Sequence, residues 1–151
     1  MPGRFSASKV VYYSTILTSQ DLHVAALLDS DAAGNQAAEQ DELWQLLTHK
    51  RILRTGDHIA DVKRAEIEDL VRTSLAIVAR DEMGWDSVAT VKAQNTRPMM
   101  EILASEHDGV SKWKLARAFV RWIAANGTAA LTDDERAAWA SLVAATNKAL
   151  N

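Results

Sequence analysis

The chain has 151 residues, of which 48% are apolar and 25% are charged. A length of about 150 residues predicts one domain, and this apolar content is enough to form a hydrophobic core. With 17 basic and 20 acidic residues the formal net charge is -3, so the composition fits neither a collagen-like nor a disordered chain. We therefore expect a single globular domain over residues 1–151.

The sequence has no cysteine, which excludes disulfide frameworks, thiolate nucleophiles and Cys-ligated zinc or iron–sulfur sites. Apolar runs such as Leu75–Ala79 are short, whereas a membrane span needs about 20 apolar residues and a signal sequence about 7 to 15. We therefore expect a cytoplasmic protein that has no membrane partner and depends on packing for its stability.

Apolar residues recur at spacings of three and four along most of the chain, and prolines occur only at Pro2 and Pro98. This pattern predicts an all-α fold with short connections. The segment Val10–Tyr13 is rich in strand-forming residues, but we assign it to a helix because no second strand is evident as its partner. The first helix is expected over about Ser8–Leu28, either unbroken or broken near Thr18–Asp21. Its expected core residues are Tyr12, Tyr13, Ile16 and Leu17.

The middle of the chain predicts two further helices. Asn35 is expected to cap the first of them, which ends near Gly56, where glycine suits a left-handed C-cap. The next helix is expected to begin after Asp57 or Asp61 and to end at Gly84.

The second half of the chain has clearer boundaries. A short helix precedes Pro98 and another, Met99–His107, follows it. Ser111 is the predicted N-cap of the next helix, which stops at Gly127. Thr132–Glu135 is a capping box that starts the last helix. The whole pattern predicts an all-α, single compact irregular bundle of five to seven helices.

Charge is unevenly distributed along the chain. Residues 1–48 carry two bases and six acids, and residues 81–110 again carry two bases and six acids. Residues 111–125 carry four bases and no acid. The helix expected over this last segment is therefore the main candidate for contact with a polyanion.

Lys114, Arg117 and Arg121 lie in one row of that helix, at spacings of three and four residues, and Lys112 supports the row. We call these residues the basic row. No acid lies four residues from Lys114, Arg117 or Arg121 to neutralise them, and such a row suits the phosphates of a nucleic acid, either RNA or DNA. An ordinary solvated helix face is the alternative, although such faces usually mix both signs of charge.

The other side of the same helix is predicted to be buried. Its expected core residues are Leu115, Ala116, Phe119, Trp122 and Ile123. Trp113 and Val120 lie at the edge of this apolar arc. For Trp113, burial in a core or an interface is the simpler expectation, and a half-exposed ring beside two lysines is the alternative.

Lys50, Arg51 and Arg54 form a second basic cluster, in the last turn of the helix that is expected to end near Gly56. Cations at a helix C-terminus are favoured by the helix dipole, which explains the cluster without a ligand. The cluster becomes a second nucleic-acid-binding candidate if it shares a surface with the basic row.

For an enzyme, the best set is His58 with His107–Asp108 and either Asp133 or Asp134, which is similar to the metal set of helical HD-type phosphohydrolases. His107 and Asp108 also fit a helix C-terminal histidine and a turn aspartate. We accordingly expect no catalytic residue, no metal and no cofactor.

Two non-enzymatic alternatives stay open. Met99–Val120 could form a helix–turn–helix that binds DNA, although its turn is long and Trp113 is unusual for contact with base edges. The chain could instead be a helical protein-interaction adaptor or a homo-oligomer, in which the basic row meets an acidic surface.

A cysteine-free helical chain of about this size, with acidic blocks and isolated basic rows, resembles the small helical subunits of CRISPR ribonucleoprotein effector complexes. The resemblance covers the whole chain in size and helix content. It implies a non-enzymatic, structural role in antiviral defence, in which several copies stack along a complex. Such subunits would contact larger protein subunits through acidic or apolar faces and nucleic acid through basic ones.

Overall fold

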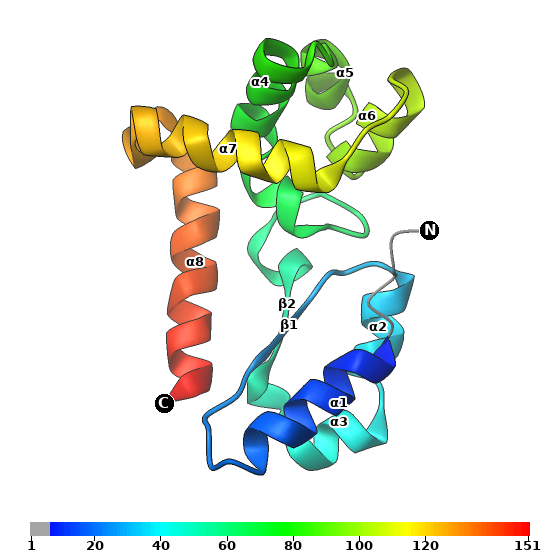
Figure 1. Cartoon of the computed structure of the whole chain (residues 1–151), viewed down its shortest axis with the longest axis vertical. Helices are drawn as coiled ribbons and strands as arrows, with labels where there is room; N and C mark the ends of the chain where they lie inside the picture. The colour runs from blue at the N-terminus through cyan, green and yellow to red at the C-terminus, as the bar shows by residue number, and fades with distance from the viewer. Residues whose placement is uncertain (1–6) are drawn as a thin grey trace.

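The computed structural model describes residues 7–151, and these form eight α-helices, short 3-10 helices and two strands (Figure 1). The helices are α1 (Ala7–Thr18), α2 (Ala32–Ala38), α3 (Asp41–Leu46), α4 (Arg72–Met83), α5 (Val88–Ala93), α6 (Met99–Glu106), α7 (Lys112–Asn126) and α8 (Asp133–Leu150). The strands are β1 (Ala26–Leu28) and β2 (Ile52–Arg54). The predicted all-α class is confirmed, with eight helices where five to seven were expected.

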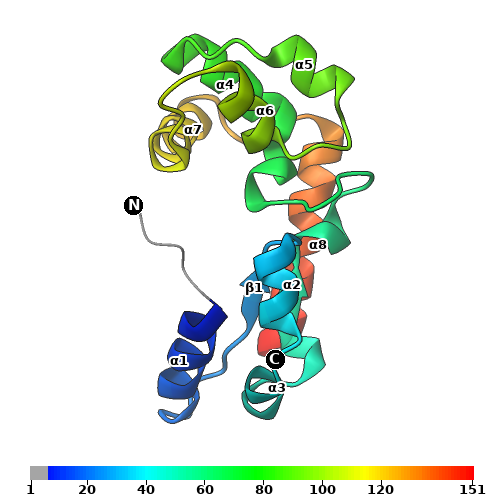
Figure 2. The same ribbon diagram turned by 90° about the vertical axis from the view of Figure 1, so that its right-hand side faces the viewer.

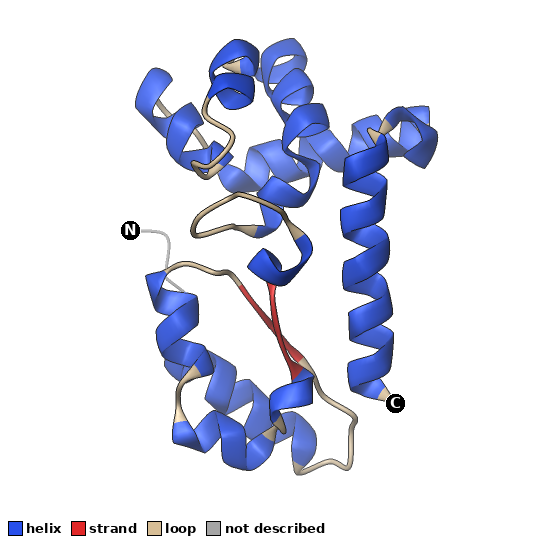
Figure 3. Ribbon diagram, turned by 180° about the vertical axis from the view of Figure 1, so that it is seen from behind, coloured by secondary structure: helices blue, strands red, loops and turns tan. Residues whose placement is uncertain are grey.

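The elements form two groups along the long axis of the molecule. Helices α1, α2 and α3 lie at one end with the two strands, and α4 to α7 lie at the other (Figures 1 and 2). The last helix, α8, runs from the end of α7 along the side of the molecule toward the first group (Figure 1). The two strands lie beside the helices of the first group, between them and α8 (Figure 3).

Each group has its own apolar core. The larger core is built by α4, α5, α6 and α7, and its fully buried members include Val78, Met99, Ile102, Leu103 and Leu115. The smaller core lies under α1, α2 and α3 and contains Ala26, Leu28, Ala37, Leu43 and Leu47. The functional candidates on α7 therefore sit on the larger of the two cores.

The first expected helix breaks near Thr18–Asp21, which was one of the two expectations, but residues 22–28 after the break form no second helical piece. Val10–Tyr13 is helical as expected, but α1 ends at Thr18 and the chain turns at Asp21 with a φ of 56°. Of the residues expected to continue the helix, only Ala26–Leu28 form β1, which pairs in parallel with β2 so that Ala26 lies beside Ile52. A short apolar run carries no periodicity that separates a strand from a helix, and this is why the sequence did not reveal the pair.

The expected core residues of α1 are in fact on its surface. Tyr12 is 61% exposed and Tyr13 is 52% exposed, and Ile16 and Leu17 are also exposed. The helix instead turns its buried Ser14 toward the protein, with the half-buried Val10 and Val11 packed on the smaller core. Large apolar residues surround most of α1, so their spacing alone did not identify the buried side.

The second expected helix is also divided. Asp31, rather than Asn35, is the N-cap, and its carboxylate accepts from the backbone N–H of Gly34 at 2.7 Å. The helix breaks between α2 and α3, and the chain then enters β2. Gly56 lies within the 3-10 helix Thr55–His58, so its expected role as a left-handed C-cap was wrong.

The boundaries predicted for the second half are confirmed. Gly84 ends α4 in the left-handed conformation with a φ of 71°, although α4 begins at Arg72 and not after Asp57 or Asp61 as expected. Ser111 caps α7, because its side chain accepts from the N–H of Lys114. Thr132 and Glu135 form the predicted capping box of α8. These signals involve residues within four positions of each other, so a sequence pattern is sufficient to identify them.

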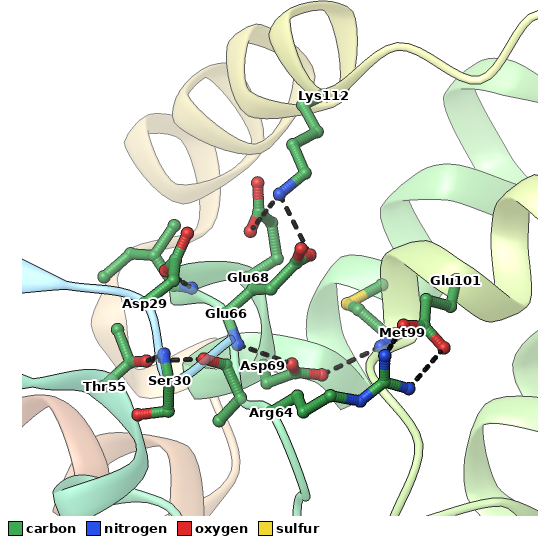
Figure 4. A network of polar contacts seen from close by, with 12 residues as sticks. Asp29, Ser30, Thr55, Arg64, Glu66, Glu68, Asp69, Met99, Glu101 and Lys112 are labelled. Atoms are coloured by element: carbon green, nitrogen blue, oxygen red, sulfur yellow. Dashed lines mark hydrogen bonds and ion pairs between the residues drawn. The ribbon is translucent and has the colours of Figure 1, made fainter. Parts of the chain in front are cut away.

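A buried ion pair joins α4, α5 and α6. Asp69 lies just before α4, and its carboxylate accepts from the backbone N–H of Met99 at 2.9 Å, at the start of α6 (Figure 4). Arg72 pairs with Asp69 at 3.4 Å and donates to four backbone carbonyls at and beyond the end of α5: Val91, Gln94, Asn95 and Arg97. Burial raises the pKa of Asp69 above its usual value, against the hydrogen bonds and the arginine that lower it.

A second buried carboxylate joins α8 to α4. Glu135 accepts from the backbone N–H of Ser74 at 2.8 Å, from the Ser74 hydroxyl at 2.6 Å and from the N–H of Thr132 at 2.9 Å. Ser74 lies in the first turn of α4, where backbone N–H groups have no partner inside the helix. One side chain thus caps two helices that are far apart in sequence.

Replacing this carboxylate should strongly destabilise the protein. In Glu135→Ala the buried N–H and hydroxyl of Ser74 and the partly buried N–H of Thr132 lose their acceptor, and we expect the free energy of unfolding to fall by about 3 kcal/mol. The matched control is Asp134→Ala, the removal of an exposed acid in the same helix turn, for which we expect a loss below about 1 kcal/mol. Urea unfolding measures both, and equal losses in the two variants would contradict this role.

Candidate nucleic-acid interface

Helix α7 carries the basic row across one end of the molecule (Figure 1). It is packed against the larger core by the buried Leu115 and Ala118, with the half-buried Phe119, Trp122 and Ile123 beside them. The ring of Phe119 stacks on that of Trp122 at 5.9 Å. One side of α7 is therefore fixed, and the other faces solvent.

The solvent face of α7 is more apolar than the sequence predicted. Trp113 is 65% exposed and Val120 is 63% exposed, and Ala116, an expected core residue, is exposed too. The expectation that Trp113 is buried was wrong for this chain on its own. The physical reason is that the neighbouring helices cover only one side of α7, so the edges of its wide apolar arc stay open.

Two cations of the basic row share this exposed face with Trp113. Lys114 and Arg117 are exposed, and neither forms an ion pair within the described residues 7–151. The guanidinium carbon of Arg117 lies 4.7 Å from the centroid of the Trp113 ring, which is cation–π geometry. We call Trp113, Lys114 and Arg117 the α7 platform.

The other two cations of the row are paired with acids from distant parts of the chain. Arg121 contacts Glu82 at the end of α4, with 2.6 Å between nitrogen and oxygen. Lys112 contacts Glu66 at 2.9 Å and Glu68 at 3.4 Å. These pairs span between 39 and 46 positions of sequence, so counting acids four residues away could not find them.

Lys112 lies in an acidic environment that ties α7 to the turn before α4 (Figure 4). Partial burial lowers the pKa of Lys112, but the hydrogen bond from its ammonium to Glu66 and the charges of Glu68 and Asp29 outweigh it, so the pKa is raised. Burial also raises the pKa of Asp29, whose carboxylate accepts from the N–H of Ile67 at 3.0 Å. Lys112 therefore acts mainly to hold α7 against Glu66 and Glu68.

The Arg54 guanidinium of the second basic cluster is used within the fold. It donates to the carbonyl oxygens of Gly34 and Asp29, each at 2.8 Å, and also to the side chain of Asn35. Lys50 is exposed and Arg51 is half-buried in the 3-10 helix His49–Arg51, which follows α3. Because α3 and α7 lie at opposite ends of the long axis (Figure 1), the second cluster and the basic row do not share one surface.

The residues of the metal-hydrolase alternative are only partly brought together. His58 and Asp134 line one open depression of about 780 Å³ beside α8, and His58 contacts the Ser141 hydroxyl through Nδ1 at 2.8 Å. His107 and Asp108 are not among the residues that line it, and His107 Nε2 lies 2.9 Å from the hydroxyl of Ser87. Within residues 7–151, no group of three or more His, Asp or Glu side chains is arranged to hold a metal ion.

The helix–turn–helix alternative corresponds to α6 and α7, which are connected by residues 107–111. This connection is longer than the three- or four-residue turn that is typical of the motif. Trp113 and Lys114 lie in the first turn of α7, the part of a recognition helix that would contact base edges.

The comparisons with known proteins add no family. The chain matches no protein-family model, and searches of curated proteins and of solved structures find no match to it. Among the helices of the described residues, none combines the length and the apolar character that crossing a bilayer requires.

Removing the Lys112 charge should have a small, pH-dependent effect on stability. Because the side chain is half exposed, we expect Lys112→Gln to lower the free energy of unfolding by less than about 1 kcal/mol near pH 7. Folding raises its pKa, so this contribution is present below the usual value of 10.5 and is lost as pH rises through the folded-state value. Urea unfolding of both proteins near pH 7 and at about pH 11 measures how the stability difference between them changes with pH. A difference that grows with pH would contradict a pKa that folding raises.

Proposed function

We propose that this protein is a non-enzymatic, nucleic-acid-binding structural subunit of a larger ribonucleoprotein complex. The observation that carries the proposal is the α7 platform, in which two exposed cations without an acidic partner in the described chain lie beside an exposed aromatic ring. A row of cations on a helix binds the phosphate backbone without distinguishing the base sequence.

The pairing within the basic row defines how each residue would contribute. Lys114 and Arg117 would make direct phosphate contacts. Arg121 would join them, because its exposed pair with Glu82 has little energy to lose when a phosphate replaces the carboxylate. Lys112 would act mainly by holding α7 in place through Glu66 and Glu68.

The net charge of the chain limits this binding to a local surface. At a formal charge of -3 the protein as a whole repels polyanions, so attraction comes from the short stretch of α7 alone. Larger protein subunits would therefore hold the chain on the nucleic acid, as the resemblance to the small subunits of CRISPR effector complexes implies. On the same resemblance we propose a role in antiviral defence with several copies in one complex, and from the composition we propose a location in the cytoplasm.

Neutralising the exposed cations should weaken binding and reduce its dependence on salt. For the triple variant Lys114→Gln, Arg117→Gln and Arg121→Gln we expect weaker binding of a labelled single strand of about 15 nucleotides. The slope of log affinity against log salt should flatten by about 0.7 for each phosphate that is no longer neutralised, or about 2 for the three substitutions together. Fluorescence anisotropy over a salt series measures both quantities.

The matched control removes an exposed lysine elsewhere, in Lys148→Gln near the end of α8. This variant should keep the affinity and the salt slope of the wild type. Unchanged affinity and slope in the triple variant would refute the assignment of the basic row, whether or not the protein binds nucleic acid through another surface.

A protein-interaction adaptor or homo-oligomer is the second candidate, and the outer face of α1 favours it. Tyr12, Tyr13, Ile16 and Leu17 are exposed there, and exposed aromatic and aliphatic side chains that lie together are typical of protein interfaces.

Light scattering tests self-association through this face. If α1 pairs copies, the mass of the isolated chain rises above 16.6 kDa as concentration increases, and the double variant Tyr13→Ser and Ile16→Ser abolishes the rise. A mass that stays at that of one chain in the wild type would exclude the homo-oligomer.

A further inference from the structure

We infer that Trp113 is a stacking site for an unpaired base, so that the α7 platform takes single-stranded nucleic acid. This inference rests on the proposed function and adds to it the kind of nucleic acid and the residue that recognises it. Phosphate contacts by Lys114 and Arg117 alone would not distinguish a strand with bases from one without them.

The geometry of Trp113 supports this role. The side chain is 65% exposed, although an indole ring is among the most costly side chains to leave in water. Arg117 lies over the ring at 4.7 Å, a cation–π contact that favours this orientation of the indole on the surface. A base stacked on the indole would remove apolar area from water without a conformational change in the helix.

The charges beside the ring specify a nucleic acid as the occupant. Lys114 is the next residue in α7, and Arg117, one turn further along, lies over the ring, so two exposed cations are close to the indole along the helix. A strand whose base stacks on Trp113 would place its neighbouring phosphates near these cations. Bases inside a duplex are already stacked on each other, and they cannot reach an aromatic side chain on a straight helix.

Trp44 provides an internal comparison within the same chain. It is 40% exposed, near the second basic cluster, but its indole N–H donates to the carbonyl of Ala38 and its ring lies 4.4 Å from that of His49. Its polar atom and one part of its ring are therefore used within the fold. Trp113 is the more exposed of the two rings and has Arg117 over it, so the inference is limited to α7.

The test compares two strands that have the same charge. One is a labelled thymidine strand of about 15 nucleotides, and the other is an abasic strand with the same number of phosphates. Stacking predicts that the wild type binds the thymidine strand about 5- to 100-fold more tightly than the abasic strand. In Trp113→Ala this ratio should fall to about 1 while the affinity for the abasic strand stays the same, and Trp113→Phe should keep part of the ratio.

Val120→Ala is the matched control, because it removes another exposed apolar side chain from the same face of α7 and should leave the ratio unchanged. A ratio near 1 in the wild type, or a ratio unaffected by Trp113→Ala, would overturn the stacking site. The proposed function would survive either result if Lys114→Gln weakened binding of both strands equally. Failure of the wild type to bind either strand at low salt would overturn both.

Discussion

The buried pair of Asp69 and Arg72 is the interaction on which the larger core depends. Asp69 begins α6 by accepting from Met99, and Arg72 closes α5 by donating to its last carbonyls and to those of the segment that follows. The two helices are thereby held against the start of α4, and α7 packs on the surface that results. A pair that loses hydration on burial adds little net stability, and the raised pKa of Asp69 agrees with such a cost. Its main effect is to fix where the helices lie.

Carboxylates that accept from helix N–H groups or pair with cations also hold α7 and α8 in place. Glu135 caps α8 and also the first turn of α4, while Lys112 ties the start of α7 to Glu66 and Glu68. As a result, the exposed side of α7 is carried by a helix that is fixed along its other side. A rigid platform loses little entropy when a ligand binds, which allows a small surface with few cations to be effective.

Local signals in the sequence were sufficient for the helix ends and insufficient for long-range pairing. The caps at Gly84, Ser111 and Thr132 involve neighbouring residues, and all three were predicted. The parallel pairing of β1 with β2 and the neutralisation of Arg121 by Glu82 depend on residues more than 20 positions apart, which spacing along one helix cannot show. The exposure of Trp113 was the less favoured of two expectations, although its position between two lysines was the signal that pointed to it.

The most direct test of the account follows the indole N–H signals of the five tryptophans in a nitrogen-15 NMR titration of the full chain with a thymidine strand. The signal that disappears in Trp113→Phe identifies Trp113. If α7 binds the strand, this signal and the backbone amides of α7 shift when the strand is added, while the signals of the half-buried Trp85, Trp122 and Trp139 stay in place. Shifts confined to the end of the molecule that carries Trp44, or no shifts at low salt, would contradict the central claim that α7 is the nucleic-acid interface.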